Sequence, residues 1–259
     1  MRVKLVRLAI ISVCVAFVCV GVSNAQNLAT KKPSIETIQV SENIYMLRGK
    51  GGNVGVLKGT QRTIIIDGQF ARAFNDIAAA IKVITPHPVT HLINTHYHSD
   101  HTSANEKWLE QGATIIAHIN TRDALSAEIS ATEPNPRLPM LPVNALPFIT
   151  FTEQLTLHEG SENIEIVHFP KAHTQGDIAV FFPKSNVIVT GDLYFVGVTP
   201  FIDTQSGGTY QGYLLAMKSI LDRADQDTKI IPGHGPLTNK STMQRDYESL
   251  QEFDPTSLD

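Results

Sequence analysis

Residues 94–101, with the sequence NTHYHSDH, concentrate three histidines and one aspartate within six consecutive positions. In an extended segment, His96 and His98 project to the same side. Asp100 and His101 follow where the chain turns into a predicted helix, so they can face a second point nearby. Neutral imidazole and carboxylate are ligands that zinc accepts. The cluster therefore predicts a metal site, although Asp100 alone also suits a helix cap and any one histidine also suits an exposed surface.

Three further residues lie just beyond predicted strands and beside glycine or another turn former: His173 in KAHTQGD, Asp192 in VTGDLYF and His234 in IPGHGP. Strand ends in layered α/β folds are where ligands are bound. Each residue taken singly is more often structural than functional. As a set, they complete the donors that a metal site needs.

The first half of the chain alternates short strands and helices. Residues 35–66 predict an antiparallel meander, and the apolar run 64–66 predicts a strand covered on both faces. A helical apolar period spans residues 70–84 and ends before Pro86. Beyond it, the sequence predicts a strand at 91–95, a helix starting at a capping box over 103–106, and a strand at 113–118. This order predicts a layered α/β unit.

The second half again consists of predicted strands followed by helices. It is separated from the first half by an irregular connection, residues 133–147, which contains five prolines. Apolar patterns there predict strands at 149–157, 163–169, 178–182, 186–190 and 229–231, and helices at 210–221 and 243–250. Two halves of this kind predict two sheets packed face to face with helices outside.

The pattern His96-x-His98-x-Asp100-His101, followed at these intervals by His173, Asp192 and His234, resembles the metallo-β-lactamase superfamily over about residues 36 to 237. The resemblance implies an α/β fold, a four-layer αβ/βα sandwich of two mixed sheets, and two zinc ions per chain at one edge. It implies that His96, His98 and His173 hold the first zinc. It further implies that Asp100, His101 and His234 hold the second, and that Asp192 bridges both.

The same resemblance implies a zinc-dependent hydrolase. Two zinc ions, two aspartates and a bridging hydroxide leave a net charge of about +1, which favours a developing oxyanion. Metal coordination lowers the pKa of bound water to roughly 7. We therefore expect the bridging hydroxide to attack the carbonyl carbon of a small cyclic amide or ester, with Asp100 orienting the nucleophile.

Supporting roles leave alternatives open. Tyr194 can donate to the oxyanion or simply pack in the core. Asp67 and Asp177 can each fix the tautomer of a ligand or form a turn. The loop over residues 50–53 can fold over a substrate or be a plain hairpin turn. Four aromatic residues can line an apolar pocket or belong to the core, namely Phe148, Phe151, Phe195 and Phe201.

The substrate is less constrained than the fold. The lactamase branch usually has Cys or Ser where this chain has Asp192, and some members have a basic residue shortly afterwards; here residues 193–196 are LYFV. An aspartate resembles the thioesterase, lactonase and nuclease branches. The alternatives are therefore a glyoxalase-II-like thioester hydrolase and a non-catalytic periplasmic zinc-binding protein. An iron-loaded redox enzyme is disfavoured, because such relatives typically replace His98 with Glu and require a flavin domain.

Residues 1–25 have the pattern of a signal peptide: three basic residues, an apolar run over 8–22, and Ser-Asn-Ala before the expected cleavage site. The run of about 15 apolar residues is short for a membrane anchor, which needs roughly 20. The prediction is a single hydrolase domain over 26–259, exported to a bacterial periplasm or secreted. The mature chain then has no cysteine and keeps 18 of 21 basic residues against 25 acidic ones, a charge of about −7. This disfavours nucleic acid and leaves a small carbonyl compound as the partner, with no membrane contact after cleavage; the oligomeric state is not predicted.

Overall fold

In the computed structural model, which describes residues 34–129 and 135–252, the apolar run Ile64 to Ile66 lies at the centre of a seven-stranded sheet and is fully buried. The predicted signal peptide lies outside the described residues. The sheet has the strands β1 (Glu36–Gln39), β2 (Ile44–Arg48), β3 (Val54–Lys58), β4 (Thr63–Ile66), β5 (Val89–Ile93), β6 (Thr114–His118) and β7 (Ile149–Phe151), in that spatial order. β1 to β4 are antiparallel, as predicted, and β4 to β7 are parallel, so the sheet is mixed.

The second sheet has six strands in the order β13-β12-β11-β10-β9-β8. Their bounds are β8 (Gln154–Glu159), β9 (Glu162–His168), β10 (Ile178–Phe182), β11 (Val187–Val189), β12 (Lys229–Ile231) and β13 (Thr238–Asn239). All neighbours are antiparallel except β11 and β12, which are parallel. This sheet is mixed as well.

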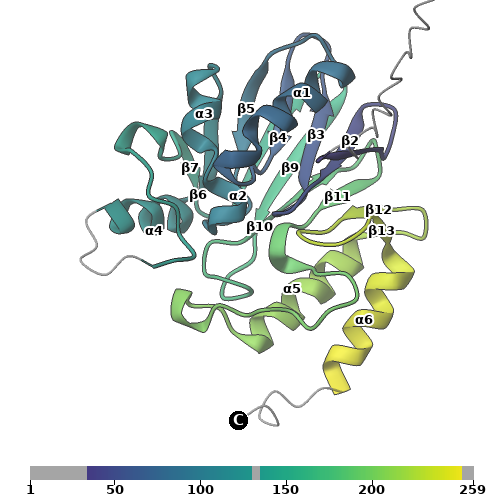
Figure 1. Cartoon of the computed structure of the whole chain (residues 1–259). Coiled ribbons are helices and arrows are strands. Elements are labelled where there is room, and N and C mark those ends of the chain that lie inside the picture. The colour runs from purple at the N-terminus through teal and green to yellow at the C-terminus, as the bar shows by residue number, and fades with distance from the viewer. Residues whose placement is uncertain (1–33, 130–134, 253–259) are drawn as a thin grey trace, which may run out of the picture. The chain divides into compact units, whose positions relative to one another are not determined.

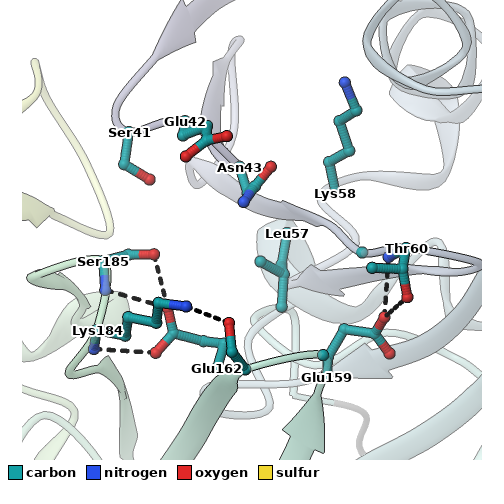
Figure 2. Close-up of a pocket in the computed structure, with 13 residues that line it drawn as sticks. Ser41, Glu42, Asn43, Leu57, Lys58, Thr60, Glu159, Glu162, Lys184 and Ser185 are labelled. Atoms are coloured by element: carbon teal, nitrogen blue, oxygen red, sulfur yellow. Dashed lines mark hydrogen bonds between the residues drawn. The ribbon is translucent and has the colours of Figure 1, made fainter.

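Helices cover the outer faces of the two sheets (Figure 1). Their bounds are α1 (Phe74–Ile84), α2 (Ser99–Thr102), α3 (Asn105–Glu110), α4 (Ile119–Ile129), α5 (Tyr210–Arg223) and α6 (Lys240–Glu252). Ile77 of α1 and Trp108 of α3 pack on the first sheet, while Met217 of α5 and Met243 of α6 pack on the second. The predicted four-layer αβ/βα sandwich is confirmed.

The central core lies between the two sheets. It is built from inward-facing residues of both, such as Ile66 and Ile93 of the first sheet and Val180 and Ile231 of the second. Burying one such side chain contributes about 1.5–3 kcal/mol. Because the facing surfaces are apolar along most of the strands, the polar residues that follow the strands are left at the edges.

Three local predictions were wrong or incomplete. The predicted strand 149–157 is two strands: β7 closes the first sheet and β8 opens the second, because the chain turns at residues 152–153. The predicted capping box fails, because Ala104 is the N-cap of α3 and Ser103 instead donates its hydroxyl to the carbonyl of Ser99. Helix α4 was not predicted, since its sequence has no continuous apolar stripe. No helix among the described residues is long and apolar enough to cross a bilayer.

Candidate metal centre

The candidate ligands lie at one edge of the sandwich, in the segments that directly follow β5, β9, β11 and β12. His96 and His98 follow β5, and the chain then turns into α2, which carries Asp100 and His101. His173 lies between β9 and β10, whereas Asp192 lies in the short 3-10 helix Gly191–Leu193 after β11. His234 follows β12. The structure therefore brings all seven predicted ligands to one edge.

The first group consists of His96, His98, His173 and Asp192, all buried, with one donor atom of each within 4.8 Å of the others. Nδ1 of His98 lies 3.0 Å from Nε2 of His173. Oδ2 of Asp192 lies 3.5 Å from Nε2 of His173 and 3.7 Å from Nε2 of His96. Three imidazole nitrogens and one carboxylate oxygen thus surround one point, as a tetrahedral zinc site requires.

The second group consists of Asp100, His101 and His234, again with donor atoms within 4.8 Å of one another. Nε2 of His234 lies 3.2 Å from Oδ2 of Asp100. The other oxygen of Asp192, Oδ1, lies 3.1 Å from Nε2 of His101 and 3.4 Å from Nε2 of His234. Asp192 therefore directs one carboxylate oxygen to each group.

Hydrogen bonds fix which nitrogen of each histidine is free. Nδ1 of His173 donates to the carbonyl of Phe201 at 2.8 Å, and Nε2 of His98 donates to Oδ2 of Asp203 at 2.8 Å. The two nitrogens that remain, only 3.0 Å apart, then both present lone pairs. Such a contact needs a proton or a cation between the atoms.

Asp67 organises histidines of both groups. Its Oδ2 accepts from Nδ1 of His101 at 2.8 Å and from the hydroxyl of Thr95 at 2.7 Å. Oγ1 of Thr95 lies 3.1 Å from Nδ1 of His96, where it is placed to accept. Nε2 of His96 and Nε2 of His101 are thus left free to bind a metal. Of the two roles left open for Asp67, the structure supports tautomer control.

Unsatisfied atoms show that these residues fit a cation. Within the described part of the chain, Nε2 of His96, Nε2 of His101 and Oδ1 of Asp192 are buried without a hydrogen-bond partner. The 3.1 Å contact of His101 with Asp192 lacks hydrogen-bond geometry. Buried polar atoms without partners cost free energy. Metal ions in the two groups would satisfy all three, and nitrogen and oxygen donors without sulfur suit zinc among other divalent ions.

Burial favours the neutral form of the histidines of the first group. Burial lowers the pKa of His96 well below its usual value, and the neighbouring His101 adds to this effect. Burial also lowers the pKa of His98, and it lowers the pKa of His173 to about 4. Neutral imidazole is the form that binds a metal.

The second group holds protons when no metal is present. Burial opposes protonation of His101, but the charges of Asp192 and Asp100 outweigh it and raise the pKa of His101 well above its usual value. Burial likewise opposes protonation of His234, but the carboxylates of Asp100 and Asp192 raise its pKa to about 9. Burial disfavours the charge on Asp192, yet His101 and His96 lower its pKa well below the usual range. A metal must therefore displace protons here.

Asp203 was missed by the sequence analysis. It lies 105 residues from His98 along the chain, in a loop without a motif, and its side chain also accepts from Ser206. Nothing in the sequence pairs it with a histidine. Asp177, in contrast, binds the backbone and hydroxyl of Thr174 and forms a turn rather than fixing a ligand histidine.

Tyr194 is not part of the site. Its hydroxyl donates to Oδ2 of Asp246 on α6 at 2.6 Å, and its ring is buried in the core below α5. Of the two roles left open for Tyr194, the structure supports core packing and not donation to an oxyanion, because its hydroxyl is bonded to Asp246. Phe195 and Phe201 do border the site, with the Phe195 ring stacked on His234, whereas Phe148 is exposed elsewhere and Phe151 contacts His118.

The glycine-rich loop is buried against the site. A Cβ on Gly52 would lie 2.2 Å from Cε1 of His101, so only glycine fits there. The side chain of Asn53 donates to the carbonyls of Pro232 at 2.9 Å and Gly235 at 3.0 Å, on either side of His234. The loop therefore supports two ligands and ties the two halves of the chain together.

Comparisons with known proteins agree with this geometry. Over 211 residues the chain is 26% identical to a probable metallo-hydrolase of Methanocaldococcus jannaschii, covering 77% of this chain and 90% of the relative. It is 31% identical over 117 residues to a hydroxyacylglutathione hydrolase of Nostoc punctiforme, covering 45% of this chain and 37% of that enzyme.

Solved structures share the fold. A metallo-beta-lactamase from Pontibacter korlensis superposes with a TM-score of 0.70 at 17% identity, covering 85% of this chain and 100% of that one. The DIM-1 metallo-beta-lactamase gives a TM-score of 0.69 at 19% identity, covering 85% and 98%. Residues 47–234, which include all seven ligands, match the family described as the metallo-beta-lactamase superfamily. The chain thus belongs to the metallo-beta-lactamase superfamily and is a metallo-hydrolase.

Proposed function

We propose that this hydrolase binds two zinc ions, one in each ligand group, and hydrolyses a small carbonyl compound. The observation that carries the proposal is the position of Asp192, whose two oxygens lie next to different groups, Oδ2 near His96 and His173 and Oδ1 near His101 and His234. A carboxylate in this position can bridge two cations a few ångströms apart. Two ions explain the unsatisfied atoms of both groups at once.

When bound, the zinc ions would supply a hydroxide at neutral pH and polarise the carbonyl of the substrate. The residues of the chain provide orientation. Asp100 and His234 are the partly exposed members of the ligand set, with side chains 23% and 31% exposed, so the substrate approaches from their side. Asp100 is placed there to orient the attacking hydroxide by accepting a hydrogen bond from it, and the buried histidines keep the ligand atoms fixed.

For the substrate we propose a small cyclic amide or ester. The rings of Phe195 and Phe201 border the ligand histidines at 5.3 to 6.3 Å between ring centroids. Aromatic walls of this kind exclude water and hold a compact, largely apolar ring.

A thioester is the second candidate. Two observations favour it: the bridging ligand is Asp192, as is typical of the thioesterase branch, and one of the relatives is a hydroxyacylglutathione hydrolase. The chemistry of attack on the carbonyl carbon is the same for both substrates.

We further propose that the enzyme is exported, to a periplasm or outside the cell, on the basis of the leader pattern in residues 1–25. Its partner is then a small molecule from that compartment. The acidic mature chain does not suit nucleic acid, and no membrane contact is proposed after cleavage.

The experiment joins metal analysis to an activity panel of a β-lactam, a lactone and a thioester. The proposal expects two equivalents of zinc and zinc-dependent turnover of at least one compound. Tight zinc binding with no turnover of any of them would favour the non-catalytic zinc-binding protein instead. Metal content near one equivalent at saturation would contradict the bridging role of Asp192.

A further inference from the structure

An arginine lies at the rim of the metal centre and has no function in the arrangement described so far. The backbone carbonyl of Arg137 accepts from the N–H of Ser99 at 2.6 Å, which attaches its loop between the ligands His98 and Asp100. Its guanidinium lies over the ring of Phe201, with Cζ 4.4 Å from the ring centroid. Arg137 therefore connects the two segments that border the first ligand group.

Phe201 carries the guanidinium close to the ligands. Its ring centroid lies 5.9 Å from that of His173 and 6.3 Å from that of His98, and its carbonyl accepts from His173. Phe201 is still 43% exposed. The aromatic ring thus forms a platform that is open to solvent on one side and touches two ligands on the other.

Among the described residues, the guanidinium of Arg137 contacts the ring of Phe201 but forms no ion pair. In residues 34–129 and 135–252, no carboxylate lies within 4 Å of its guanidinium, whereas Arg48, Arg62 and Arg223 each form an ion pair. The four residues that follow Asp192, with the sequence LYFV, include no lysine or arginine. A stacked guanidinium keeps its N–H groups free at its edge, where they match the geometry of a carboxylate.

We propose that Arg137 binds a carboxylate of the substrate, so that the natural substrate is an anionic carbonyl compound whose charged end lies on the side of the first ligand group. This rests on the proposed hydrolase function and specifies its substrate class. Stacking on Phe201 fixes the plane of the guanidinium. The anion then determines which way round the scissile carbonyl faces Asp100 and His234.

The test compares an anionic probe with its neutral twin. S-phenyl monothiosuccinate and its methyl ester differ in charge and by one methyl group, as do 5-oxotetrahydrofuran-2-carboxylate and its methyl ester; only cleavage of the thioester or lactone bond is counted. Hydrolysis of each pair by the zinc-loaded protein is measured for the wild type, R137Q and R137K. R223Q is the matched control, because Arg223 also lies over a phenylalanine ring, Phe181, but at the far end of α5.

We expect R137Q to raise KM for the anionic member of the accepted pair about tenfold, with kcat and the KM of the methyl ester within twofold of wild type. R137K should restore part of the preference for the anionic probe. Added salt should weaken this preference in the wild type and R137K, which carry a cation at position 137, but not in R137Q. R223Q changes neither value. Equal effects of R137Q on both probes, or no effect, would show that Arg137 merely holds the loop and would overturn the inference.

A binding measurement separates this inference from the hydrolase proposal. N-phenylsuccinamate, an amide analogue chosen to resist hydrolysis, is titrated into wild type and R137Q by calorimetry, together with its methyl ester. Weaker binding of the anion alone to R137Q supports the role of Arg137 even if no probe is turned over, in which case only the hydrolase proposal fails. Unchanged binding, combined with normal turnover, rejects the role of Arg137 and leaves the hydrolase intact.

Discussion

Asp67 supports histidines of both ligand groups, so the variant Asp67→Asn is expected to weaken both metal sites. The residue is buried and has a φ of 65°, a conformation that asparagine tolerates well, so the backbone should survive the exchange. In the wild type, Oδ2 accepts from His101 and from the hydroxyl of Thr95. The amide of the variant can present its oxygen to the backbone N–H of Thr95. Its NH₂ group then faces Nδ1 of His101 and the hydroxyl of Thr95, both of which donate to the carboxylate in the wild type.

The magnitude follows from those two contacts. His101 must then accept at Nδ1 and carry its proton at Nε2, the atom that faces the metal. A hydrogen bond to a charged group contributes about 1.5–3 kcal/mol. Exchange of such an outer partner typically lowers metal affinity about 10–100-fold. In the metal-free protein, where His101 is protonated, loss of the carboxylate should lower the free energy of unfolding by about 3 kcal/mol.

Zinc affinity is measured by competition with a chromophoric chelator, and stability by urea unfolding of the metal-free protein. Asp203→Asn is the matched control, because Asp203 contacts His98 of the first group only. Asp203→Asn should lower the zinc affinity of the first site and leave that of the second site close to the wild-type value. If Asp67→Asn binds both zinc ions with wild-type affinity, the hydrogen bonds of Asp67 do not set the ligand tautomers and the reasoning is refuted.

Three further variants or conditions test the site. Asp100→Asn should lower kcat at least about 100-fold while circular dichroism shows a folded protein; full activity would contradict the orientation of the nucleophile. Tyr194→Phe should cost about 1 kcal/mol of unfolding free energy through the lost bond to Asp246, with kcat within twofold, and a large drop in kcat would restore a catalytic role. Because the pKa of His234 is raised to about 9, zinc binding at pH 7 should release protons, and the apparent zinc affinity should rise as the pH increases toward 9. Calorimetry in buffers of different ionisation enthalpy measures this release, and a buffer-independent heat would contradict it. In the metal-free protein, the ion pair of His234 with Asp100 should stabilise the fold fully between about pH 4 and pH 6.5; it should be lost as the pH rises through about 9 and again when Asp100 is protonated at lower pH.

The layers and the convergence of the candidate ligands could be predicted because each depends on a strong local signal. The buried run Ile64 to Ile66 and the helical period over residues 70–84 are both visible in the sequence and both present in the fold. The ligands follow strand ends, and strand ends of one sheet meet at one edge. The cluster at His96 therefore indicates at which edge of the sandwich the site lies.

The predictions that failed depend on contacts between distant residues. The apolar residues before and after the polar residues 152–154 keep the same alternating phase, so the pattern from Ile149 to Leu157 is easily taken for one strand. Asp203 serves His98 only because the fold places its loop there. Tyr194 follows Asp192 by two residues, yet the start of an extended segment turns it toward α6.

Asn53 and the ligands join the two halves of the chain, so metal binding should also affect the stability of the fold. Each group takes residues from both halves: His96 and His98 with His173 in one, Asp100 and His101 with His234 in the other. A bound ion is therefore a cross-link between the sheets, and it stabilises only the folded state. A molecule stripped by a chelator should open first along this edge, with faster amide exchange around residues 49–53. Scarcity of metal would then shorten the lifetime of the folded enzyme and also abolish its activity.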